Sequence, residues 1–292
     1  MLNLSQNLIR IVMASANHKT DHEFHLVDPS PWPLLASIGF LIMAGSAAFY
    51  FHDKPYSGLG VIGGLVMLLY VGYRWWGDCI AEGDKHHTRP VKTGLRFGMG
   101  LFIISEVMFF FAFFFSFFHN LFLPVDLLDG AWPKGEGAFP PADLKVIDAW
   151  HLPLFNTLLL LLSGTTITWA HSALLQGNRK DLIRGLVCTI VLGFTFTCVQ
   201  AYEYAHAFHE LFKFSDNSYS ANFYMATGFH GLHVIIGTIF LVVCLVRALK
   251  GQMNENHHLG FEFAAWYWHF VDVVWLFLFF NVYVLAGWGH AH

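Results

Sequence analysis

The stretch GMGLFIISEVMFFFAFFFSFF, residues Gly98–Phe118, decides the class of this protein. It is apolar apart from Glu106 and short hydroxyl side chains, and it is as long as the roughly 20 residues that an α-helix needs to cross a bilayer. Six further apolar runs are separated by Pro, Gly and charged residues. The sequence therefore predicts an all-α integral membrane protein with seven spans: Trp32–Phe51, Gly58–Ile80, Leu95–Leu123, His151–Leu175, Leu182–Tyr204, Ala221–Leu249 and Gly260–Trp288.

The composition excludes the other large classes. The 292 residues are 55% hydrophobic and only 12% charged, whereas soluble domains carry about 25% charged residues. A net charge of −4 without a basic block gives no electrostatic footprint for nucleic acid. The four cysteines lie far apart and form no CxxC pair, which favours packing over a disulfide framework or a metal site.

We expect one membrane domain over residues 1–292, in which a polar arm (1–30) precedes two helices (32–80) and five more (95–288). An acidic loop lies at 124–149. Placing the N-terminus inside puts twelve of the sixteen Lys and Arg residues on inner segments. The positive-inside rule therefore predicts an inner N-terminus and an outer C-terminus.

Glu106 is the first candidate functional residue because it falls near the middle of its span. An ionised carboxylate at that depth costs at least about 2.5–3.5 kcal/mol, so we expect Glu106 to be protonated at neutral pH. Two interpretations stay open. The acid either takes part in proton transfer or gating, or it joins two helices by a hydrogen bond.

Eighteen histidines are the second signal. His230 and His233 share one helix face, as do His206 and His209, and Glu203 with His206 forms a single ExxH. A di-iron carboxylate site needs two such motifs, so hydrogen-bonded histidines are favoured and no metal is expected. A free-standing membrane metalloenzyme remains the alternative function.

Two further groups of side chains stand near or within the spans. Glu262, His269 and Asp272 lie along one side of the seventh span, where they form a polar clamp between helices or, alternatively, a proton relay. Trp75 and Trp76, followed by Glu82 and a histidine pair, lie at the inner interface. They suit phospholipid headgroups or an ordinary aromatic belt.

Several long strings resemble one family, subunit III of the haem–copper cytochrome c oxidases. The strings are PSPWPL (29–34), GLRFGMGLFIISEVMFF (94–110), NTLLLLLSG and TWAH (within 156–171), ATGFHGLHVIIGTIFLVVC (226–244) and FEFAAWYWHFVDVVWLFLF (261–279). They run in order through most of the chain. Subunit III of a quinol oxidase is a closely related alternative.

The resemblance implies a chain without haem or copper that packs on subunit I, with subunits I and II as its partners in a proton-pumping oxidase. That complex passes electrons from cytochrome c to dioxygen in the bacterial or mitochondrial inner membrane. Two and five helices would enclose a V-shaped cleft filled with phospholipid, and the subunit would support proton uptake and the stability of subunit I. Glu106 matches the family's carbodiimide-reactive glutamate. The positions implied to bind lipid are Trp75, Trp76, Glu82, His87, Arg96 and Arg247.

The sequence departs from the family at the second span. Several relatives read WWRD, whereas this chain has Gly77 between Trp76 and Asp78, and Arg74 one turn away is the alternative cation. The N-terminal arm adds a last candidate. His18, His22 and His25 titrate near neutrality and form a possible proton antenna beside the mouth of a proton path in subunit I. A solvated tail is the alternative.

Overall fold

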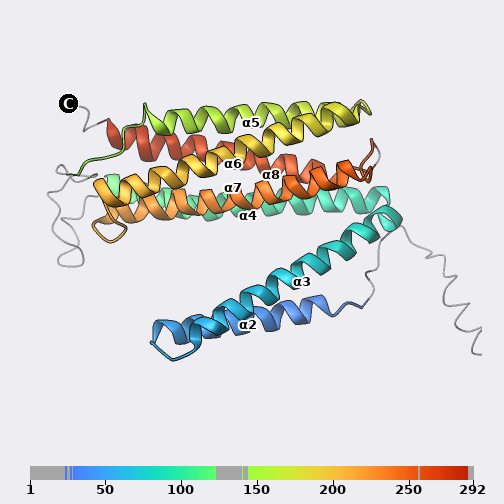
Figure 1. Ribbon diagram of the computed structural model, residues 1–292, viewed down its shortest axis with the longest axis horizontal. Helices are drawn as coiled ribbons and strands as arrows, with labels where there is room; N and C mark the ends of the chain where they lie inside the picture. Colours follow the sequence, from blue (N-terminus) through green and yellow to red (C-terminus); the bar gives the residue numbers. More distant parts are fainter. Residues whose placement is uncertain are drawn as a thin grey trace, which may run out of the picture. The chain divides into compact units, whose positions relative to one another are not determined.

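The computed structural model describes Phe24, Val27, residues 29–122, Pro140, residues 144–255 and residues 257–288 (Figure 1). Seven helices in these ranges are long and apolar enough to cross a membrane, which confirms the predicted fold class. The elements are α2 (Trp32–Phe51), α3 (Ser57–His86), α4 (Arg89–Phe122), α5 (Leu152–Leu175), α6 (Arg179–Glu210), α7 (Ser218–Leu249), α8 (Leu259–Leu278) and the π-helix η2 (Phe279–Leu285).

Local sequence signals set the helix ends. Proline lies in the first turn of α2 and α5. Its missing N–H costs no hydrogen bond there, because the first N–H groups of a helix have no acceptor within the helix. The Asn178 and Asn217 side chains cap α6 and α7 by accepting a backbone N–H three residues on. Gly177 and Gly251 adopt φ +70 and +69 beyond the ends of α5 and α7, the left-handed conformation that glycine supplies at helix termini.

The chain divides into two compact units, residues 1–95 and residues 96–292. In the first unit, α2 and α3 form an antiparallel hairpin (Figure 1). Glycines bring its helices together: a Cβ added to Gly64 would lie 2.6 Å from the backbone nitrogen of Met43, and one added to Gly60 would collide with Ser46. This close approach is typical of membrane helix pairs.

In the second unit α5, α6, α7 and α8 form a four-helix arrangement in which α8 contacts both α5 and α7. The fully buried Trp268 of α8 lies at its centre. Its indole N–H donates to Ser163 Oγ of α5 at 2.8 Å, while Gly193 of α6 and Gly237 of α7 make room for its ring. A second indole, that of Trp275, donates to Thr157 Oγ1 at 2.9 Å.

Helix α4 joins the second unit through aromatic side chains. Phe110 is 2% exposed, and its ring lies 6.1 Å from that of Phe270 on α8. Phe109 lies 5.0 Å from Phe229 on α7 in an edge-to-face contact, the arrangement that aromatic quadrupoles favour. The phenylalanine-rich stretch that decides the class thus also attaches α4 to its neighbours.

Candidate functional site

Glu106 faces α7, where it meets a histidine. Its Oε2 lies 3.0 Å from His233 Nε2, and the two side chains are 23% and 10% exposed. The other ring nitrogen, Nδ1, lies 2.7 Å from the carbonyl oxygen of Phe229. Because a carbonyl only accepts, Nδ1 must carry a proton and donate it.

With the proton placed on Nδ1, the contact between His233 Nε2 and Glu106 Oε2 can take two forms. Either protonated Glu106 donates to a neutral imidazole, or an imidazolium donates to a carboxylate. In both cases the pair holds one shared proton and has no net charge, which suits its place in a span. The rings of Phe109, Phe110 and Tyr267 lie 5.0 to 6.3 Å from the imidazole.

His230, one turn before His233, is fully buried and lies apart from Glu106. Its Nε2 lies 3.1 Å from the carbonyl oxygen of Val271 on α8, so it joins α7 to α8. In the described part of the chain, no group of three or more His, Cys, Asp or Glu side chains could hold a metal ion.

The polar residues of α8 divide into two contacts. Glu262 accepts a forked pair of hydrogen bonds from Arg96 of α4, at 2.9 and 2.8 Å. His269 instead approaches Asp272, at 3.7 Å between Nδ1 and Oδ2, and Thr168 of α5, at 3.3 Å. Gly164 of α5 leaves the space that the Asp272 carboxyl occupies.

The single ExxH is split between the interior and the surface of the second unit. Glu203 is 2% exposed and accepts hydrogen bonds from Tyr283 and Gln200. His206 lies 3.5 Å from Glu210 in an exposed pair. The sequence pattern drew attention to Glu203 without indicating that it is buried.

The residues predicted to lie at the inner interface are on α3 or directly after its end at His86. Trp75 and Trp76 are exposed, whereas Glu82 and His87 are partly buried. Nearby, the Trp32 indole N–H donates to Asp78 Oδ2 at 2.6 Å, and the Arg74 guanidinium lies 5.8 Å from the Trp32 ring centroid.

The remaining predicted residues lie elsewhere. Arg247 is in the last turn of α7, and its Nε atom is buried without a hydrogen-bond partner in the described structure. His18, His22 and His25 lie outside the described residues.

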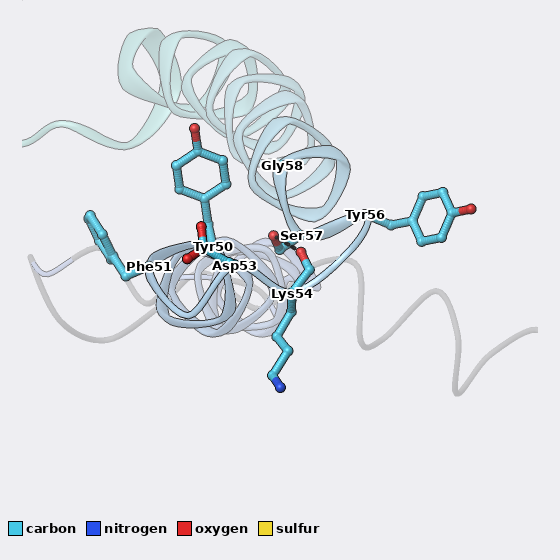
Figure 2. Close-up of a pocket in the computed structure, with 7 residues that line it drawn as sticks. All are labelled: Tyr50, Phe51, Asp53, Lys54, Tyr56, Ser57 and Gly58. Carbon is cyan, nitrogen blue, oxygen red and sulfur yellow. Dashed lines mark hydrogen bonds between the residues drawn. The ribbon is translucent and has the colours of Figure 1, made fainter.

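A cavity of about 500 Å³ lies at the α2–α3 turn (Figure 2). Asp53 and Tyr56 in this turn have positive φ angles of 53° and 63°, which are uncommon for residues other than glycine. The Lys54 side chain points down in the view and the Tyr56 side chain points to the right, each away from the turn (Figure 2). Polar groups therefore do not converge on a ligand here, and the Glu106–His233 pair is the stronger candidate site.

Comparison with known proteins gives a consistent result. The family model for cytochrome c oxidase subunit III matches residues 22–289. A probable cytochrome c oxidase subunit 3 from Rickettsia bellii is 55% identical, over 91% of this chain and 96% of the relative. Cytochrome c oxidase subunit 3 proteins from Prototheca wickerhamii and Carassius auratus are 51% and 49% identical, over 91% and 92% of this chain and 98% of each relative. The chain belongs to the cytochrome c oxidase subunit III family.

Proposed function

We propose that this chain is a non-redox subunit of the oxidase, one that supports proton uptake and the stability of the catalytic subunit. As a member of its family it is a multi-pass inner-membrane protein and part of an oxidase complex. The proposed partners are subunits I and II, with cytochrome c as electron donor to the complex. The proposed orientation is an inner N-terminus and an outer C-terminus.

The hydrogen-bond contacts of two histidines on α7 are the main support for a subunit without a redox centre. His230 and His233 contact backbone carbonyls, and His233 also contacts Glu106, so their hydrogen bonds join helices α4, α7 and α8. Metal analysis of the separated, purified chain tests this. We expect no iron or copper at stoichiometric amounts, and one metal ion per chain would favour the metalloenzyme alternative.

The Glu106–His233 pair is proposed as the proton-linked site. We expect Glu106 to react with a hydrophobic carbodiimide, because a protonated and partly exposed carboxyl inside the membrane is accessible to that reagent. Glu106→Gln should abolish labelling of the chain and leave oxidase turnover largely intact, since the amide can still hydrogen-bond to His233. Glu203→Gln, which changes a buried acid, is the control and should leave labelling unchanged. Persistent labelling of Glu106→Gln would contradict the assignment.

Phospholipid binding is proposed for two groups of residues, one in each unit. Trp75, Trp76, Glu82 and His87 form the group in the first unit, and Arg96 and Arg247 the group in the second. Arg247 is the better phosphate ligand, because Arg96 already donates a forked pair to Glu262 and guanidinium suits phosphate geometry.

Lipid retention by the purified complex tests this proposal. Arg247→Ala should lower the phospholipid that mass spectrometry finds with the complex. Arg184→Ala is the control, because Arg184 is an exposed cation paired with Asp181. Equal retention in both variants would remove Arg247 from the site.

A proton antenna is proposed for His18, His22 and His25. Replacing the three with Gln should slow steady-state oxygen reduction most above about pH 8, where bulk protons are scarce and histidine buffering matters. Electron input from cytochrome c should be unchanged. Equal rates from pH 6 to 9, with the complex intact, would leave the arm as a tail.

A further inference from the structure

Four buried polar side chains form a second site that the proposed function does not use. They are Asn156 of α5, Gln200 and Glu203 of α6, and Tyr283 of η2, here called the Glu203 cluster. Each is at most 5% exposed: Asn156 0%, Gln200 5%, Glu203 2% and Tyr283 1%. Polar groups so buried in a membrane span are costly unless each is hydrogen-bonded.

The hydrogen bonds of this cluster run in one direction. Asn156 Nδ2 donates to Gln200 Oε1 at 3.2 Å, and Gln200 Nε2 donates to Glu203 Oε1 at 3.1 Å. Tyr283 Oη donates to the same Glu203 oxygen at 2.7 Å. Two donors therefore converge on Oε1, while Oε2 is buried without a partner in the described structure.

This asymmetry is the pattern of a protonated acid, in which Oε1 is the carbonyl and Oε2 carries the hydroxyl. An ionised Glu203 would leave one bare anionic oxygen in a region of low dielectric. In the described structure no Lys or Arg forms an ion pair with Glu203.

A protonated Glu203 leaves one donor and one acceptor unmatched. The donor is Oε2–H, and the acceptor is Asn156 Oδ1, which is likewise buried without a partner. Both belong to side chains that hydrogen-bond to the Gln200 amide. A buried polar atom left unpaired costs about 1–3 kcal/mol, and buried water molecules commonly satisfy such atoms with about three hydrogen bonds each.

We propose that the Glu203 cluster is a binding site for one internal water molecule. The water accepts a hydrogen bond from the Glu203 hydroxyl and donates one to Asn156 Oδ1. The site joins α5, α6 and η2 through a neutral acid, and it is separate from the Glu106–His233 pair on α4 and α7.

The π-helix is part of this site because it sets the position of Tyr283. Each residue of an α-helix advances the side chain by about 100°, so the wider π turn changes the direction of the residues that follow it. Tyr219 of α7 reinforces this geometry by donating to the carbonyl oxygen of Val282 at 3.0 Å. A local π turn at a site of buried polar contacts fits the frequent occurrence of such turns at functional positions.

Infrared spectroscopy of the whole oxidase complex tests the protonation state. We expect a carboxylic acid C=O band that is present in the parent, absent in Glu203→Gln, and retained in Glu106→Gln, the matched variant of a second glutamate within the spans. A carboxylate band lost in Glu203→Gln would show that Glu203 is ionised and overturn the proposal. Glu203→Asp is the second variant if Glu203→Gln fails to assemble: it keeps a carboxyl, so a protonated site should give a shifted carboxylic acid C=O band, whereas an ionised site should give a shifted carboxylate band.

A structure of the complex at a resolution that shows water tests the ligand. We expect one water molecule within hydrogen-bond distance of Glu203 Oε2 and Asn156 Oδ1, also present in Glu203→Gln, whose amide N–H can donate in place of the hydroxyl. Asn156→Leu should lose it. A direct contact between the acid and the amide, an empty site, or an occupant that depends on added Na⁺ would each overturn the proposal.

Discussion

The helices of the α2–α3 hairpin and the α5–α8 helices are all apolar enough to cross a membrane, but the two regions hold together differently. In the most apolar windows of α2 and α3, 6% and 11% of residues are buried, against 39% in α5 and 56% in α8 with η2. The hairpin relies on glycine contacts such as that of Gly64 with Met43. The α5–α8 helices add buried indole–hydroxyl hydrogen bonds. Apolar composition therefore places helices in the membrane, but polar contacts and fitted side chains fix which helices meet.

The largest expected effect comes from removing the side chain at the centre of the α5–α8 helices. Trp268→Ala should lower the free energy of unfolding by about 3–5 kcal/mol, because it leaves a cavity between Gly193 and Gly237. It also removes the indole donor from Ser163 Oγ, whose hydroxyl still donates to the carbonyl oxygen of Leu160. Thermal unfolding of the purified subunit in mild detergent measures it. Trp76→Ala, at a side chain 71% exposed, is the control and should change little. Equal losses would mean that the two regions are held together alike.

A smaller effect is expected from overpacking the hairpin. Gly64→Ala should cost about 1–3 kcal/mol, because its new methyl group would lie within 2.8 Å of three Met43 atoms. Gly63→Ala is a matched control on the preceding residue, where a Cβ meets nothing within 4 Å. Resistance to unfolding in increasing sodium dodecyl sulfate compares the two. If both variants match the parent, the hairpin tolerates separation of its helices.

The smallest effect is expected at the Arg96–Glu262 pair. Its side chains are 43% and 13% exposed, so solvent screening limits the interaction to about 1 kcal/mol. A double-mutant cycle of Arg96→Gln and Glu262→Gln measures this coupling. The same cycle on Arg184 and Asp181, a more exposed pair within α6, should give less than about 0.5 kcal/mol. A larger coupling for the surface pair would reverse this ranking.

The sequence predicted the seven helices because apolar runs of bilayer length have few alternatives. The ends were less predictable, since hydropathy marks where hydrocarbon ends and not where hydrogen bonding ends. The second span was expected to end at Ile80, whereas α3 continues to His86 through AEGDKH. Similarly, α4 begins at Arg89, six residues before the expected start at Leu95.

The candidate site was predictable in part. Glu106 was evident as an acid in the middle of a span, but its partner is 127 residues away, and no local spacing indicates such a contact. For the same reason Glu262 was grouped with His269 and Asp272, its neighbours on α8, although its hydrogen bonds go to Arg96 on α4. The π turn had no signal, because FFNVYVL contains neither Gly nor Pro.

The π turn at Phe279–Leu285 also links the number of residues in this segment to the hydrogen bonds of Glu203. A π turn holds about one residue more than an α turn, so deleting one residue there would allow a regular α-helix without disturbing Leu259–Leu278. Tyr283 would then turn away from Glu203, and the buried acid would lose a donor. Relatives one residue shorter in this segment are therefore expected to carry an apolar residue in place of Glu203, so that a gap in one helix predicts a substitution in another.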